Sequence, residues 1–84
     1  MAAEPETPRH LRKRSFSIAG HRTSVALEPE FWTVLERESH RTGRTLSAFV
    51  AGIDAARAAR PLASALRLAA LSAASHSAAP PRPE

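Results

Sequence analysis

A short segment in which apolar and more polar residues alternate is followed almost directly by the start of a helix. This junction constrains the fold more than any other feature of the chain. Residues 22–27 alternate in character, and Glu28, Pro29 and Glu30 follow them directly. Successive side chains of a strand point to opposite faces. One face of this strand is apolar enough to be buried and consists of Thr23, Val25 and Leu27. The other face carries a guanidinium, a hydroxyl and a methyl group, on Arg22, Ser24 and Ala26.

A strand of this length is not stable alone, because its backbone donors and acceptors stay open and its apolar face stays uncovered. The chain has 84 residues, of which 43% are apolar, and a domain of this size buries little surface. Cysteine is absent, so neither a disulfide nor a thiolate metal site can add the missing stability. We therefore expect a homodimer in which two such strands pair.

Basic residues are concentrated in the N-terminal part of the chain. The net charge is +4, and no acidic residue lies between Thr7 and Leu27. The basic residues of that stretch are Arg9, Arg12, Lys13, Arg14 and Arg22, and the acidic residues that follow it are Glu28, Glu30, Glu36 and Glu38. Such asymmetry favours a partner with regular negative charge, of which nucleic acid is the commonest. The alternative is a solvated basic tail that keeps the protein soluble.

Enzymatic and membrane functions find no support in the sequence. The four histidines lie far apart and have no metal-ligand spacing. No carboxylate pair, phosphate-binding loop or nucleophile with a neighbouring base indicates catalysis. We expect no metal, no cofactor and no enzymatic activity. No apolar run approaches the roughly 18 residues of a membrane span, and the N-terminus lacks an apolar signal segment, so we expect the protein in the cytoplasm.

The chain divides into three parts. Residues 1–13 contain two prolines and scattered charge, which predicts a disordered basic arm. For residues 14–73 the sequence predicts one domain that is mainly helical, with one short strand per chain. Residues 74–84 are rich in Ser, Ala and Pro and predict a disordered tail.

Three helices are expected after the strand. Pro29 suits the first position of the first helix, and Gly43 suits the position just after its end. Thr45 is a good cap for the second helix, whose apolar stripe consists of Leu46, Phe49, Val50 and Ile53. A third, Ala-rich helix is expected to run to about Ala73.

This order of strand, helix, tight turn and helix resembles the ribbon-helix-helix family of bacterial DNA-binding proteins. The residues that carry the resemblance are the strand 22–27, the segment Glu28-Pro29-Glu30-Phe31-Trp32 and the turn Gly43-Arg44-Thr45-Leu46-Ser47. Segments 53–57 and 64–67 are similar to a branch of the family with an added C-terminal helix. The resemblance covers roughly residues 14–71. It implies an intertwined homodimer that regulates transcription, in which one strand from each chain forms an antiparallel ribbon that enters the DNA major groove.

The resemblance also implies roles for individual residues. The outward side chains Arg22, Ser24 and Ala26 would contact bases, since these groups suit guanine, several base edges and the thymine methyl. The dimer core would consist of Thr23, Val25, Leu27, Trp32, Leu35, Leu46, Phe49, Val50 and Ile53. Phosphate would be held at the start of the second helix and by the arm, through Arg44, Thr45, Ser47, Arg12, Lys13 and Arg14. Two plainer alternatives stay open: a merely solvated strand face and an ordinary capped helix.

The residues before the strand indicate a further alternative. Phe16 and Ile18 alternate in phase, and Gly20-His21 would form a two-residue type II′ turn. That turn pairs Ile18 with Thr23 and Phe16 with Val25. A dimer would then carry four strands, about 19 Å wide at roughly 4.8 Å spacing, against a groove of about 12 Å. The competing function is a dimeric, antitoxin-like module that binds another protein and does not read DNA.

Overall fold

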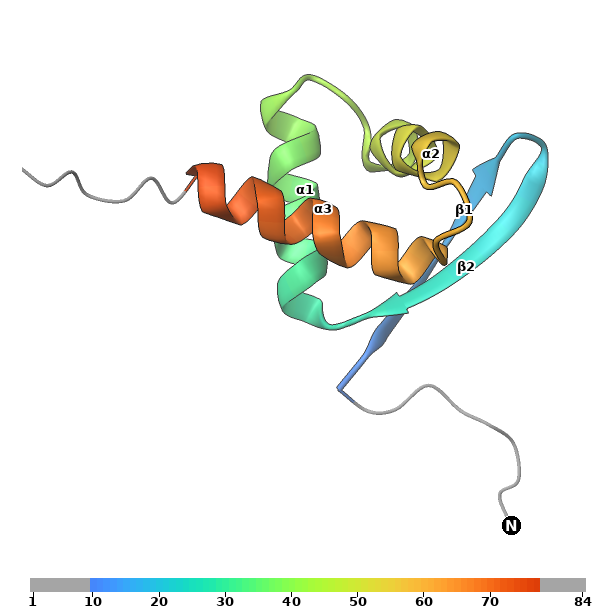
Figure 1. The fold of residues 1–84 in the computed structure, drawn as a ribbon, viewed down its shortest axis with the longest axis horizontal. Helices are drawn as coiled ribbons and strands as arrows, with labels where there is room; N and C mark the ends of the chain where they lie inside the picture. Colours follow the sequence, from blue (N-terminus) through green and yellow to red (C-terminus); the bar gives the residue numbers. More distant parts are fainter. Residues whose placement is uncertain (1–9, 78–84) are drawn as a thin grey trace, which may run out of the picture.

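A two-stranded antiparallel hairpin packs against three helices in the computed structural model, which describes residues 10–77 (Figure 1). The elements are β1 (Arg12–Ile18), β2 (His21–Leu27), α1 (Pro29–Arg41), α2 (Leu46–Ala56) and α3 (Leu62–Ser77). The helices lie on one side of the hairpin, and α3 crosses α1 (Figure 1). The mainly helical fold is confirmed, and the chain contains the N-terminal hairpin that the sequence offered as an alternative to a single strand. Within the described residues, no helix has the length and apolar character needed to cross a membrane.

The hairpin and α3 extend beyond the limits predicted for the domain. β1 begins at Arg12 rather than at residue 14, because Arg12 pairs with Leu27 at the far end of β2. Lys13 is likewise part of β1 and not of an arm. Helix α3 continues past Ala73 to Ser77. The rest of the predicted arm and tail, 1–9 and 78–84, lies outside the described residues.

The hairpin turn differs from the predicted one. Ile18 pairs with His21, so the two turn residues are Ala19 and Gly20, with φ of 52° and 82°. Positive φ at both positions is typical of a type I′ turn, and the predicted type II′ turn was wrong. The observed pairs are therefore Phe16 with Thr23 and Arg14 with Val25. Because the register differs from the prediction by two residues, every side chain keeps its predicted face.

Local capping explains where α1 and α2 begin and end. Pro29 opens α1, and Glu28 precedes it without a side-chain capping hydrogen bond. At the other end Gly43 has a φ of 73°, its amide donates to the carbonyl of His40, and the next amide donates to that of Ser39. These two bonds form a Schellman motif. Thr45 then caps α2, as predicted, and its Oγ1 accepts from the amide of Ala48 at 3.0 Å.

One chain covers the apolar face of β2 by itself. The buried core consists of Phe16, Ile18, Val25, Leu27, Trp32, Leu35, Val50, Leu66 and Ala70. Of the residues assigned to a dimer core, Val25, Leu27, Trp32, Leu35 and Val50 are buried within the chain, while Thr23, Leu46, Phe49 and Ile53 are half-buried. β1 contributes Phe16 and Ile18 to this core, and α3 contributes Leu66 and Ala70.

Helix α3 is tied to the junction between β2 and α1. Arg67 donates to both carboxylate oxygens of Glu28, at 3.0 Å and 3.3 Å, and its guanidinium lies 6.0 Å from the centroid of the Phe31 ring. The hydrogen bond from Arg67 holds the pKa of Glu28 below its ordinary value of 4.5. Leu66 is fully buried, whereas Leu68 and Leu71 lie on the exposed side of α3.

Candidate nucleic-acid interface

The face of the hairpin that points away from the helices is polar and basic. It carries alternate side chains of both strands, which form three cross-strand pairs: Lys13 with Ala26, Ser15 with Ser24, and Ser17 with Arg22. All except the half-buried Ala26 are exposed. The two central hydroxyls share a hydrogen bond, with 2.8 Å between their Oγ atoms. We call these six residues the outer face.

The predicted base contacts all lie on this outer face. Arg22 and Ser24 are exposed, and Ala26 is half-buried beside them. Ser15 and Ser17 were not among the predicted site residues, although the alternative hairpin of the sequence analysis already paired their segment with residues 22–27. The period-two alternation of residues 12–18 was the signal that could have identified them.

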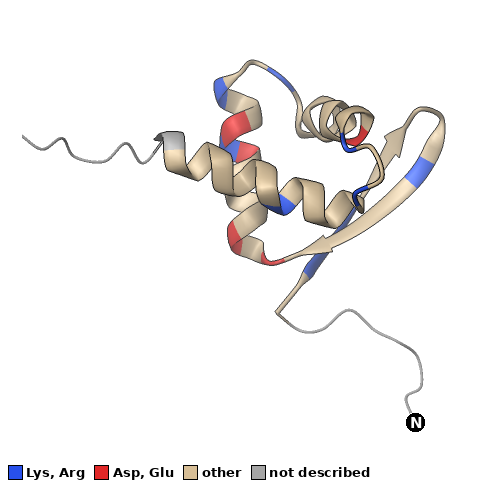
Figure 2. Cartoon of the chain, in the orientation of Figure 1, with Lys and Arg blue, Asp and Glu red and all other residues tan. Residues whose placement is uncertain are grey.

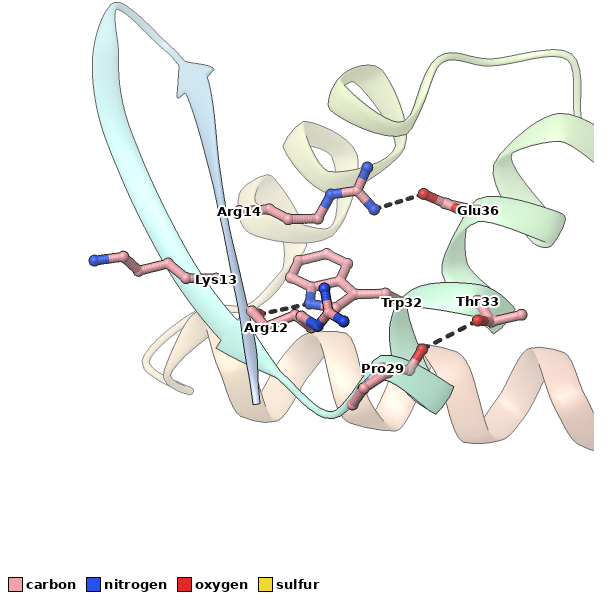
Figure 3. A pocket seen from close by; sticks show the side chains of 7 residues that line it. All are labelled: Arg12, Lys13, Arg14, Pro29, Trp32, Thr33 and Glu36. Atoms are coloured by element: carbon pink, nitrogen blue, oxygen red, sulfur yellow. Dashed lines mark hydrogen bonds and ion pairs between the residues drawn. The ribbon is translucent and has the colours of Figure 1, made fainter. Parts of the chain in front are cut away.

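The three basic residues at the start of β1 point in two directions. Lys13 points away from the helices, whereas Arg12 and Arg14 point toward them (Figure 3). The Nη1 atom of Arg14 lies 2.5 Å from a carboxylate oxygen of Glu36, and its guanidinium lies 5.4 Å from the Trp32 ring centroid. Trp32 donates from Nε1 to the carbonyl of Arg12 at 2.8 Å. Arg14 and the backbone of Arg12 therefore hold β1 against α1.

The start of α2 presents a second polar surface. Thr45 and Ser47 are exposed there, and the first amides of any helix have no partner within the helix. Anions bind at such an end because the amides and the helix dipole both favour negative charge. Arg44 precedes the cap of α2, and its guanidinium reaches over the helix to lie 6.0 Å from the centroid of the Phe49 ring.

Charge is distributed unevenly over the molecule. Neither strand of the hairpin contains an acidic residue, and blue patches lie toward both of its ends (Figure 2). The ion pairs among residues 10–77 are Arg14–Glu36, Arg41–Glu38, Arg57–Asp54 and Arg67–Glu28. Within that range neither Lys13 nor Arg22 takes part in one. The outer face therefore offers cations with no carboxylate partner.

The strand β2 followed by two helices around a tight turn is the order of elements that the sequence pattern indicated. The family model described as the ribbon-helix-helix domain matches residues 11–74. The chain belongs to the ribbon-helix-helix family. Ribbon-helix-helix domains generally bind DNA and dimerise, and their family consists of DNA-binding regulators that are generally not enzymes. Comparison with curated proteins and with solved structures gives no match.

The described part of this ribbon-helix-helix chain offers no obvious metal centre. No group of three His, Cys, Asp or Glu side chains among residues 10–77 is close enough to hold a metal ion. Asp54 lies in the last turn of α2, and its Oδ1 accepts a hydrogen bond from Nε of Arg57 at 2.6 Å. This pairing, three residues apart on one helix, is an ordinary helix-surface contact.

Proposed function

We propose that this protein is a sequence-specific transcriptional regulator, a homodimeric repressor that occupies an operator with an antiparallel β-ribbon in the major groove. The observation that carries the proposal is the outer face, where β2 exposes Arg22 and Ser24 beside Ala26. A guanidinium can form two hydrogen bonds to guanine, a hydroxyl can bond several bases, and a methyl group can contact thymine. A repressor of this kind acts in the cytoplasm, associated with the nucleoid.

Phosphate contacts would position the ribbon on the duplex. Thr45 and Ser47 at the start of α2 bind the DNA backbone in this proposal, with Arg44 adding positive charge. Of the three basic residues of β1, Lys13 is the best placed to contact phosphate, because its side chain points away from the helices (Figure 3). Arg14 is engaged with Glu36 and Trp32, so a phosphate contact from it requires that pair to open.

The test is selection of bound duplexes from a random DNA library by the purified protein. We expect enrichment of a defined site, and an affinity that falls with salt at a log-log slope near −0.9 per neutralised phosphate. Enrichment of no sequence together with no binding at low salt would reject the proposal. Binding to DNA without enrichment of any sequence would show that the protein binds DNA non-specifically.

A protein-interaction module is the second candidate function. The observation that favours it is the exposed apolar flank of α3, where Leu68 and Leu71 are 47% and 55% exposed. An apolar flank of this kind suits a protein surface and not a phosphate backbone. Under this reading the chain binds another protein in an antitoxin-like way, and DNA selection enriches nothing.

A further inference from the structure

A cleft lies between the first residues of β1 and the first two turns of α1, on the side of the hairpin that faces the helices. Arg12 and Arg14 reach it from the strand, and Trp32, Thr33 and Glu36 line it from the helix (Figure 3). Its volume is about 280 Å³. Small-molecule sites have volumes of roughly 300–1,000 Å³, so this cleft has room for a small ligand.

Positive charge predominates in the cleft. The lining residues with charged side chains are the basic Arg12, Lys13 and Arg14 and the acidic Glu36. The guanidinium of Arg12 forms no ion pair within residues 10–77. Arg14 donates to Glu36 from Nη1, and a guanidinium has five N–H donors, so most donors of Arg14 stay available. Two guanidinium groups with available donors favour an anion that has several acceptor oxygens.

The cations of the cleft point away from the outer face. Arg12 and Arg14 extend toward Trp32, whereas Lys13, which lies between them in β1, points to the other side of the hairpin (Figure 3). A duplex bound on the outer face therefore places its backbone phosphates on the opposite side of the strands. The cleft also lies beside the start of α1, where the helix dipole favours negative charge.

We propose that this cleft binds the phosphate group of a small molecule. Arg12 holds the phosphate through two parallel hydrogen bonds, the geometry in which a guanidinium recognises phosphate. Arg14, whose guanidinium lies 5.4 Å from the centroid of the Trp32 ring, supplies a second set of donors. Glu36 competes with the ligand for Arg14. The site is independent of the proposed function, because the predicted base contacts and the start of α2 take no part in it.

The experiment is a titration of the full-length protein with inorganic phosphate at constant ionic strength. Trp32 is the only tryptophan of the chain, which contains no tyrosine, so its fluorescence reports on the cleft. We expect a saturable change with phosphate and none with chloride. Isothermal titration calorimetry measures the same binding without the fluorophore. Absence of saturable phosphate binding in both measurements would overturn the proposal.

Variants with opposite effects test the assigned residues. Arg12→Gln removes one guanidinium but keeps the backbone carbonyl that accepts from Trp32, and it should weaken phosphate binding roughly ten- to a hundredfold, the effect of a lost hydrogen bond to a charged group. Glu36→Gln removes the competing carboxylate and should strengthen phosphate binding about three- to tenfold. Wild-type affinity in both variants would overturn the assignment of the site.

A matched control separates the site from attraction to net charge. Arg60→Gln removes an exposed guanidinium that does not line the cleft, and it changes the net charge as Arg12→Gln does. We expect this variant to bind phosphate as the wild type does. Equal weakening in Arg12→Gln and Arg60→Gln would overturn the site. Thermal unfolding of each variant shows whether the fold is intact.

Addition of DNA distinguishes a free phosphate from a backbone phosphate. We expect the same phosphate affinity with and without a bound duplex. A duplex that displaces phosphate would assign the cleft to the DNA backbone and overturn the separate site. Saturable phosphate binding by a protein that enriches no DNA sequence would support the site while rejecting the proposed function, so the two can fail separately.

Discussion

The two faces of the hairpin differ in burial and in chemistry. Alternate residues of the same strands give one face whose apolar side chains Phe16, Ile18, Val25 and Leu27 are buried in the core, and one face that is polar, basic and largely exposed. Arg14 and Arg22 show the contrast within one residue type: the first is bound to Glu36 and lies beside Trp32, and the second has no ion-pair partner among residues 10–77. The difference teaches that folding and recognition use separate residues of the same strands, so substitutions on the two faces should have separate effects.

Truncation on the inner face should have the largest effect. Leu27 has no exposed surface, and Leu27→Ala should lower the free energy of unfolding by about 2–5 kcal/mol through lost burial and a cavity. Chemical denaturation measures this effect. Leu71→Ala, at an exposed leucine of α3, is the matched control and should change stability by less than about 0.5 kcal/mol. Equal losses in the two variants would break the contrast between buried and exposed leucines.

Truncation on the outer face should weaken DNA binding and leave the fold intact. Arg22→Ala should cost about 1–3 kcal/mol of discrimination between the operator and unrelated DNA. Its free energy of unfolding should stay within about 0.5 kcal/mol of wild type. Binding titrations on both duplexes measure the first effect, with Arg37→Ala on the exposed surface of α1 as control. Equal losses on both duplexes would make Arg22 a phosphate contact.

Thr45 lies on neither face of the hairpin, and we expect it to contribute both to the stability of the fold and to DNA binding. Thr45→Ala removes the acceptor for the amide of Ala48 and should lower stability by about 1 kcal/mol. If α2 binds phosphate, the variant should also weaken binding to all duplexes alike. Thr45→Ser retains the cap and is expected to retain both properties. A stability loss without any change in DNA affinity would leave Thr45 as a helix cap alone.

The smallest expected effect is the pH dependence contributed by Glu28. Its pKa is lowered in the folded chain by the hydrogen bond from Arg67. A lowered folded-state pKa gives stability that is present above the unfolded pKa and lost as pH falls through the folded one. Wild type should therefore lose slightly more stability than Glu28→Gln between neutral and acidic pH, in unfolding measured across that range. Parallel pH profiles for wild type and Glu28→Gln would contradict the assignment.

The sequence predicted much of the fold because its signals were local. The alternation of residues 22–27, Gly43 after α1 and Thr45 before α2 each depend on neighbours within a few positions, and all were confirmed. The turn was predicted one residue too late, because Ala19 adopts a positive φ that is uncommon for residues other than glycine.

The missing parts depended on contacts between distant residues. The role of Arg14 follows from Glu36, which is 22 positions away, and no local pattern links the two. Ser15 and Ser17 were placed on the outer face by their pairing with β2. The added helix was predicted, whereas its anchoring through Arg67 to Glu28, 39 positions apart, was not.

The measurement that tests the central claim most directly is a map of backbone amide shifts as the protein is titrated with its selected duplex. The outer face should be the surface that binds DNA. We predict that the shifts concentrate on alternate residues of β1 and β2 and on the start of α2, and that Leu68 and Leu71 do not shift. Shifts confined to the exposed flank of α3, with the outer face unchanged, would contradict the account.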